Sequence, residues 1–260
     1  ELDVEIARGI VRGYRSVREL EPALSAGISG ALYLPEDGQV NSPRLVRALA
    51  LAAARNRAEV SEGEPASGLI RQRNRIAGVR TARREIAAGS VVVCGGVASG
   101  TLARHLGIRL PVAPVKGQIL SVETTTPPIT SNVWDEECYL VPKRDGRVIV
   151  GATEEPGTHD RRPTLGGVAG LSGAAIGLLP HLARRPFAGA WGGLRPGTPD
   201  GRPLIGPAGD PEGLLIATGH YRNGVLLAPI TGDAVSALAL GEQPAVDLSP
   251  FSPLRFEGQR

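Results

Sequence analysis

One stretch near the carboxyl end constrains the fold of this chain more than any other: Thr218-Gly219-His220-Tyr221-Arg222-Asn223-Gly224. A strand-like run, 214–217, enters it, and an apolar helix-like segment, 226–240, leaves it. Glycines at both ends allow the backbone to turn sharply and to approach a ligand closely. The first amides of the following helix have no intrahelical partners and point back into the same space. The stretch therefore suits an anion or an electron-rich ring at a helix N-terminus.

A second stretch repeats this order of elements. The run 90–94 is β-branched and apolar, which is typical of a buried strand in a parallel sheet. Gly95 and Gly96 follow it directly, and a short helix is predicted through Leu106. Strand, glycines and helix together form a ligand-facing crevice at the carboxyl end of a sheet.

The remaining pattern predicts an α/β (α+β) protein in which helix-flanked buried strands alternate with hairpins. Arg144-Asp145-Gly146 is a hairpin signal between two apolar runs. Helical spacing predicts helices over 2–20, 42–54 and 167–182, and strands are expected over 28–34, over 111–122 and from Ala188 onward.

Composition excludes several classes of protein. No apolar run approaches the roughly 18 residues of a membrane-spanning helix, and the start does not read as a signal peptide. The net charge of +3 comes with scattered arginines, which argues against nucleic-acid binding. Cys94 and Cys138 lack metal-ligand spacing and are expected to be buried free thiols in a reducing compartment. The chain has no methionine and opens inside an apparent helix, so we interpret it as a fragment or an incompletely represented chain.

The segment 192–206 is too rich in glycine and proline for a regular element. We expect a rigid loop that holds Arg195 in a fixed place. Arg195 is either a solvated surface cation or a guanidinium fork for a carboxylate or phosphate.

Several further motifs accompany the two glycine stretches. They are Asp37-Gly38-Gln39-Val40, Val91-Val92-Val93-Cys94-Gly95-Gly96, Val115-Lys116-Gly117-Gln118, Tyr139-Leu140-Val141-Pro142, Val150-Gly151-Ala152-Thr153-Glu154 and Gly193-Leu194-Arg195-Pro196. In order and spacing the chain resembles the glycine oxidase and D-amino-acid oxidase family of FAD-dependent amine oxidases. The likeness is closest to the glycine oxidases of the thiamine-synthesis type.

The resemblance implies an FAD-binding Rossmann-like domain interleaved with an antiparallel-sheet substrate domain. Segments 1–36 and 111–190 would belong to the substrate domain, and segments 37–110 and 191–260 to the FAD domain. The family begins with a Gly-x-Gly-x-x-Gly fingerprint in a βαβ unit, which this sequence lacks. Ala98 stands where the family has a bulky aromatic residue, and Ala66 where an aliphatic residue flanks the adenine.

The family oxidises an amine by moving a hydride from the substrate carbon to the flavin, which O2 reoxidises to give H2O2, while the imine product hydrolyses. The resemblance implies that Arg195 binds the substrate carboxylate, with Arg222 and Tyr139 beside it, and that no dedicated acid or base is needed. Lys116 is more simply explained as a solvated lysine, and Asp200 as a loop carboxylate. The residues implied for FAD binding are Gly95, Gly96, Ala66, Gly193, Gly219, His220, Asn223, Gly224, Val225 and Leu226.

The function implied is oxidative deamination of glycine or another small amine, in the cytoplasm and in support of thiamine biosynthesis. Three alternatives stay open: a sarcosine or D-amino-acid oxidase, a partner subunit or inactive remnant that needs another chain for FAD, and a redox-inactive module that binds small carboxylates. Homo-oligomers are also compatible with the sequence.

Overall fold

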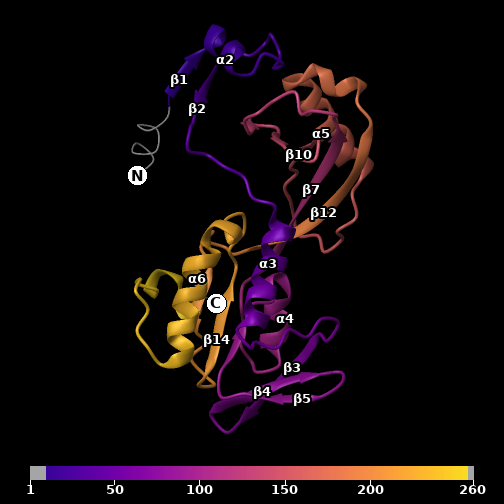
Figure 1. Ribbon diagram of the computed structural model, residues 1–260. Coiled ribbons are helices and arrows are strands. Elements are labelled where there is room, and N and C mark those ends of the chain that lie inside the picture. Colours follow the sequence, from indigo (N-terminus) through magenta and orange to yellow (C-terminus); the bar gives the residue numbers. More distant parts are fainter. Residues whose placement is uncertain (1–9, 257–260) are drawn as a thin grey trace. The chain divides into compact units, whose positions relative to one another are not determined.

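The computed structural model describes residues 10–256, which fold as two compact units, each assembled from separate parts of the chain (Figure 1). The first unit contains residues up to 41 together with 116–155 and 159–193. The second contains 42–115, 156–158 and 194 onward.

The first unit is built on a sheet with the strand order β11-β7-β10-β9-β8, in which β12 also pairs with β7. Antiparallel pairing joins β7 to β10, β10 to β9 and β9 to β8. The strands are β7 (Ala113–Glu123), β8 (Val133–Trp134), β9 (Tyr139–Pro142), β10 (Arg147–Gly151), β11 (Glu155–Pro156) and β12 (Phe187–Gly197). The tight turn between β9 and β10 confirms the predicted hairpin.

One face of this sheet forms a core with helix α5 (Leu165–Leu178) and the 3-10 helix η2 (Pro180–Arg184). Alternate strand residues point to the same face, so Leu120, Leu140 and Val150 are buried together. Thr164 caps α5 by accepting a hydrogen bond from the amide of Gly167 (3.2 Å).

The beginning of the described chain forms an antiparallel pair, β1 (Ile10–Gly13) with β2 (Gly30–Tyr33), and helix α2 (Tyr14–Leu20) lies between them in sequence. The predicted helix over 2–20 is therefore wrong over β1, and its residues 2–9 lie outside the described residues. Sequence spacing could not reveal β1, because its strand partner lies beyond the following helix. The predicted strand over 28–34 is confirmed.

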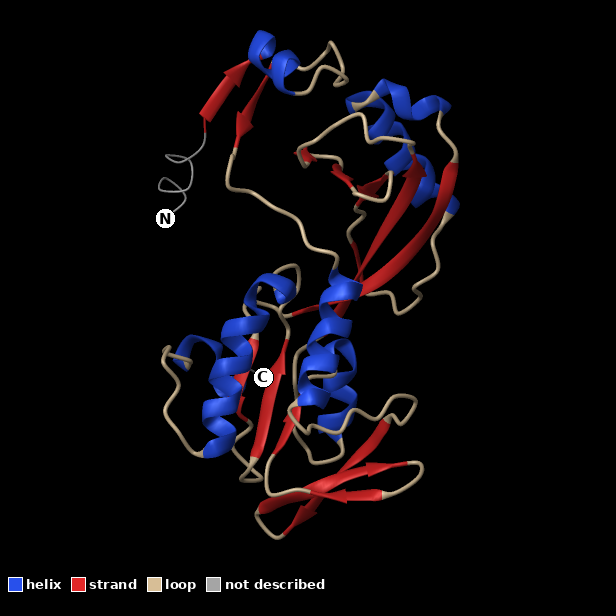
Figure 2. Ribbon diagram, in the orientation of Figure 1, coloured by secondary structure: helices blue, strands red, loops and turns tan. Residues whose placement is uncertain are grey.

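The second unit contains a three-stranded sheet with the order β13-β14-β6 and a meander of β3, β4 and β5 (Figure 2). Strand β14 (Leu214–Thr218) runs parallel to β6 (Val91–Val93) and antiparallel to β13 (Leu204–Pro207). The meander strands are β3 (Ala66–Gln72), β4 (Arg75–Thr81) and β5 (Glu85–Ala87).

Helices flank the sheet of the second unit. Helix α6 (Gly224–Leu240) packs against β13, β14 and β6, and helix α4 (Ser99–Arg104) packs against β6 and β3. The other helices of this unit are α3 (Ser42–Arg55), η1 (Gly96–Ala98), η3 (Ser249–Phe251) and η4 (Pro253–Phe256). The α3 prediction is confirmed, but its apolar residues Val46, Leu49 and Leu51 are exposed.

Two expectations are corrected by the fold. The predicted loop over 192–206 is extended as far as Gly197, because β12 continues through it. Both cysteines are free, as predicted, but Cys94 is exposed and only Cys138 is buried. Burial, followed by the nearby charges of Asp135 and Glu137, raises the pKa of Cys138 to about 12. In the part of the chain that is described, no helix is both long and apolar enough to cross a membrane.

Candidate active site

The two predicted glycine stretches lie at the same edge of one sheet. Strands β6 and β14 are parallel neighbours, so Gly95-Gly96 and Gly219-His220 follow their carboxyl ends side by side. The Thr218 hydroxyl donates a hydrogen bond to the Gly96 carbonyl oxygen (3.0 Å), which joins the two turns. Gly96 has a φ of +56°, and a Cβ placed there would meet no atom within 4 Å. The backbone at Gly96 therefore borders open space.

A third segment, the end of β12, joins this edge. The amide of Tyr221 donates to the carbonyl oxygen of Pro196 (3.0 Å). Gly219 has a φ of +79°, and a Cβ there would lie 2.7 Å from Thr198 Cγ2. The positive φ and the close approach of the Thr198 side chain both favour glycine at position 219.

This contact places the two predicted carboxylate ligands in neighbouring backbone positions. Arg195 precedes Pro196, and Arg222 follows Tyr221, so each is one residue from the bonded pair. Arg195 is half-buried and Arg222 is exposed. Arg195 lies on a strand and not on a loop, which fixes its backbone more firmly than the sequence suggested. Gly193, predicted to border the flavin, is an exposed residue of the same strand, at the end of the first unit.

Helix α6 begins at the same edge. Asn223 is its N-cap residue, but the Asn223 side chain makes no capping hydrogen bond. Gly224 is the first residue of the helix, and a Cβ there would lie 3.4 Å from His220 Cβ. The side chains of Val225 and Leu226 are exposed in the first turn. The first turn thus combines backbone donors with an apolar surface.

His220 connects the loop to α6. Its Nε2 lies 3.1 Å from the hydroxyl oxygen of Thr231, a residue within that helix. Burial lowers the pKa of His220, which favours the neutral form of the ring. A hydrogen-bonded ring in this place suits positioning of the loop.

Tyr139 belongs to the first unit, where it lies in β9. It pairs across the sheet with Gly151 of β10 on one side and with Trp134 of β8 on the other. Its ring centroid is 4.6 Å from that of Trp134, with a 42° angle between the planes. A Cβ on Gly151 would overlap Cζ and Oη of the tyrosine.

Lys116 is not solvated, so its expected role is corrected. Its side chain is 3% exposed and its Nζ lies 3.1 Å from Oε2 of Glu155. Gln118 donates to the same carboxylate through Nε2 (2.6 Å) and accepts from the amide of Thr164 (2.8 Å). Burial alone would raise the pKa of Glu155, but hydrogen bonds from Thr153, Gln118 and Lys116 lower it overall. This cluster ties β7 to the N-terminus of α5.

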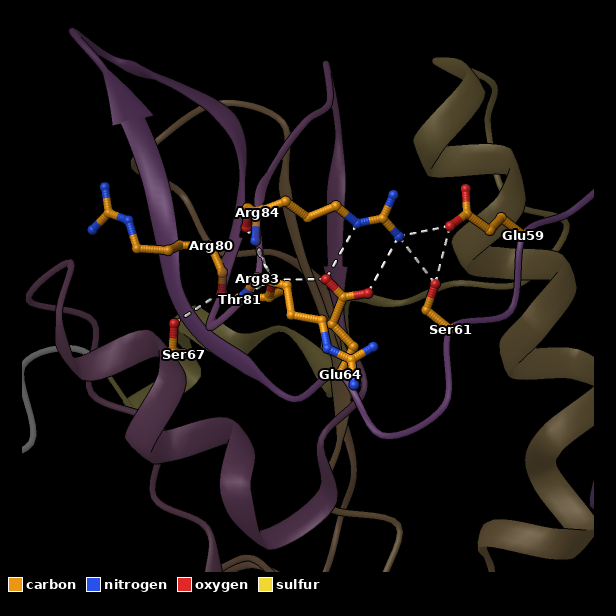
Figure 3. A network of polar contacts seen from close by, with 8 residues as sticks. All are labelled: Glu59, Ser61, Glu64, Ser67, Arg80, Thr81, Arg83 and Arg84. Atoms are coloured by element: carbon orange, nitrogen blue, oxygen red, sulfur yellow. Dashed lines mark hydrogen bonds and ion pairs between the residues drawn. The ribbon is translucent and has the colours of Figure 1, made fainter.

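Ala66, predicted to flank the adenine, is an exposed residue at the start of β3, opposite Thr81. The segment before it is held by the network in Figure 3, where Arg84 reaches Glu59 (2.7 Å) on one side and Glu64 (3.2 Å) on the other. Glu64 also accepts from the Thr81 hydroxyl (2.8 Å). The network fixes the segment that leads from α3 into β3.

Asp200 has a partner that the sequence did not reveal. Arg255 binds it with two hydrogen bonds, of 2.8 and 2.9 Å, and also donates to the Arg202 carbonyl oxygen. The two hydrogen bonds from Arg255 to the carboxylate are the main reason that the pKa of Asp200 is lowered to about 2. Asp200 thus anchors the C-terminal segment and is not a ligand candidate.

Sequence reasoning assigned no role to Thr218 and Thr231 in the second unit or to Trp134 in the first. Thr218 bonds to Gly96, 122 residues away, Thr231 contacts His220 in the loop before α6, and Trp134 pairs with Tyr139 on a neighbouring strand, so local patterns carry little sign of these contacts. Thr218 offers one signal, because it is a polar residue that ends an otherwise apolar, buried strand.

Comparison with known proteins adds to this geometry. The sequence profile of DAO, the FAD dependent oxidoreductase family, matches residues 4–238. The chain belongs to this family. FAD is accordingly the cofactor that the family implies, and the predicted α/β fold class is confirmed by solved structures of the same family type.

Three relatives describe the likeness. The chain is 39% identical to a glycine oxidase of Pseudomonas putida over 234 residues, which cover 89% of this chain and 64% of that protein. The crystal structure of glycine oxidase from Geobacillus kaustophilus superposes with a TM-score of 0.90 at 37% identity, over 96% of this chain and 68% of that one. Iminodiacetate oxidase from Chelativorans sp. BNC1 superposes with a TM-score of 0.85 at 28% identity, over 96% and 69%. The chain thus spans just under two thirds of the length of the curated relatives it matches first.

The residues at the sheet edge fit the ring end of FAD. The open space at Gly96 and the uncapped first turn of α6 with exposed Val225 and Leu226 would accept a flat ring and its negative charge. Among the described residues, no cluster of three or more His, Cys, Asp or Glu side chains could hold a metal ion.

Proposed function

We propose that this chain carries the substrate-binding and ring-binding part of an FAD-dependent oxidase of glycine or a similarly small amino acid. When bound, FAD would supply the redox chemistry, as the acceptor of a hydride from the amine carbon and the donor of electrons for the reduction of O2 to H2O2. The residues of this chain bind and orient the substrate.

The observation that carries the proposal is the hydrogen bond from Tyr221 to Pro196, because it brings the backbones of Arg195 and Arg222 into neighbouring positions. Two guanidinium groups that start from neighbouring positions can bind one carboxylate with several charge-assisted hydrogen bonds. The relatives named glycine oxidase and iminodiacetate oxidase suggest substrates that carry an amine next to a carboxylate.

The other parts of the site take supporting roles. Asn223, Gly224, Val225 and Leu226 would hold the ring of FAD at the start of α6, and Gly95, Gly96, Gly193 and Gly219 would give backbone approach. His220 would position the loop, and Ala66 would border the adenine. Tyr139 would donate a hydrogen bond to the substrate carboxylate. A role in thiamine biosynthesis and a cytoplasmic location stay predictions.

The first test is a visible absorption spectrum of the purified protein, followed by anaerobic addition of glycine. Flavin absorption that bleaches with glycine supports the oxidase. Flavin that bleaches only with sarcosine or a D-amino acid moves the proposal to that substrate. A colourless protein that binds glycine favours the carboxylate-binding module, and a colourless protein that gains flavin only with a second chain favours the partner-subunit alternative.

Arg195→Ala should raise the KM for glycine strongly while bound flavin is retained. Loss of a desolvated ion pair costs about 2–5 kcal/mol, so the expected increase in KM is about 30-fold or more. Arg104→Ala, at an exposed position in the last turn of α4, is the matched control and should leave KM unchanged. An Arg195→Ala protein with the parent's KM would contradict the assignment.

A further inference from the structure

The cross-strand neighbours of Tyr139 are arranged in a way that the predicted role of Tyr139 as a hydrogen-bond donor does not by itself require. Ile119, Gly151, Tyr139 and Trp134 are direct cross-strand neighbours on β7, β10, β9 and β8. Residues paired in this way point to the same face of the sheet. This face lies opposite the core formed with α5, since Leu120, Leu140 and Val150 point the other way.

Gly151 makes room for the tyrosine. A Cβ on Gly151 would overlap the hydroxyl end of the Tyr139 ring, at Cζ and Oη. The ring therefore lies across the backbone of β10, in the space that the side chain of any residue other than glycine would fill at position 151.

Trp134 closes the other side of the tyrosine. Its ring is tilted by 42° to that of Tyr139 with the centroids 4.6 Å apart, which is a favourable aromatic arrangement. Trp134 is 58% exposed, so it makes this contact without being part of the core. Trp134 is therefore a large aromatic residue that is mostly exposed and yet packs on Tyr139. Its effect on the position of the tyrosine ring explains this arrangement better than burial in the core does.

We propose that Gly151 and Trp134 form a clamp that sets the direction of the Tyr139 hydroxyl, and that Trp134 is a positioning residue for substrate binding. The inference rests on the proposed function, in which Tyr139 binds the substrate carboxylate. A misplaced donor weakens the hydrogen bond to the carboxylate, so the clamp acts on KM more than on kcat.

The test compares variants in the flavin-containing protein with glycine as substrate. Trp134→Ala should raise KM about 2- to 12-fold, which matches the usual contribution of an aromatic pair. Trp134→Phe, which keeps a ring, should restore KM to within about twofold. Phe187→Ala is the matched control, because Phe187 is equally exposed, at 58%, and lies at the far end of β12.

Two further variants separate positioning from general damage. Gly151→Ala leaves Trp134 in place but displaces the tyrosine ring, so it should give the same rise in KM. In Tyr139→Phe, adding Trp134→Ala should cause little further change, because the hydroxyl that the clamp directs is gone. Equal KM values in Trp134→Ala and parent, or additive effects in the double variant, would overturn the proposal.

A second measurement does not depend on activity. The ring-flip rate of Tyr139, followed by NMR, should rise in Trp134→Ala and stay at the parent value in Phe187→Ala. If the parent does not oxidise glycine but the flip rate responds, the proposed function fails while the clamp stands. If the flip rate is unchanged in Trp134→Ala, the clamp fails whatever the enzyme does.

Discussion

Gly219 shows how much of the site depends on single backbone positions. Its φ of +79° is unfavourable for other residues, and a Cβ would lie 2.7 Å from Thr198 Cγ2 and 3.4 Å from the Leu204 amide nitrogen. Gly219→Ala should therefore destabilise the protein by more than about 1 kcal/mol. The measurement is the free energy of unfolding in urea.

Gly232→Ala is the opposite case and serves as the control. Gly232 lies inside α6, and a Cβ there would meet no atom within 4 Å. Alanine should stabilise the protein by about 0.4–1 kcal/mol, because it reduces the entropy of the unfolded chain. If both variants lose similar stability, the argument from the Gly219 backbone is wrong.

Residues differ in how well the sequence predicts their place. The glycines at 95, 96 and 219 could be predicted, because a strand followed by glycine and a helix is a local pattern. The burial of Lys116 could not be predicted, since its ion-pair partner Glu155 lies on another strand, β11, where Gln118 also donates to the same carboxylate. The roles of Arg195, Arg222 and Tyr139 stay predictions until the variants are measured.

At the scale of elements, β12 is the most instructive segment. Glycine and proline favour loops, yet residues 187–197 are extended beside β7. Pro196 has no amide hydrogen, but its carbonyl oxygen still accepts the bond from Tyr221. Tertiary pairing overrides local preference here, as it does in β1, where helical spacing accompanies a strand.

The ion pair between Asp200, which follows β12, and Arg255 of η4 predicts how the stability of the protein changes at acidic pH. Because Arg255 lowers the pKa of Asp200 to about 2 from 3.8, the unfolded chain binds the proton first as the pH falls. The stabilisation is complete above about pH 4 and is lost as the pH falls through about 2. Asp200→Asn should thus lower Tm at neutral pH, and its Tm should converge with that of the parent below pH 4.

The control for this prediction is Asp233→Asn, at an exposed position on α6, which should leave Tm unchanged across the same pH range. A Tm difference between parent and Asp200→Asn that stays constant from pH 7 to pH 3 would show that the ion pair is not the cause.

At the scale of the whole molecule, each unit draws on distant parts of the chain. The core of the second unit joins Leu69, Ile76 and Val93 to Leu204 and Ile216. A fragment of residues 1–115 should therefore fail to fold cooperatively, because it lacks β13, β14 and α6. Urea unfolding followed by circular dichroism tests this, and a cooperative transition in the fragment would contradict it.

The mixed fold class was predictable at this scale, because buried strands alternate with helices and hairpins along the chain. The exposure of the apolar residues of α3 could not be predicted, since their helical spacing is the same as that of a helix with a buried face.

The pairing of β6 with β14 also has a consequence for synthesis. The hydrogen bond between Thr218 and Gly96 spans 122 residues of chain, so the first glycine turn leaves the ribosome long before its partner. At about 5–20 residues per second the delay is about 6–24 s. During that interval the three valines of β6 lack their neighbouring strand, and such exposed strand edges are the ones that aggregate. We therefore expect the yield of this protein in cells to depend on chaperones that shield nascent strands.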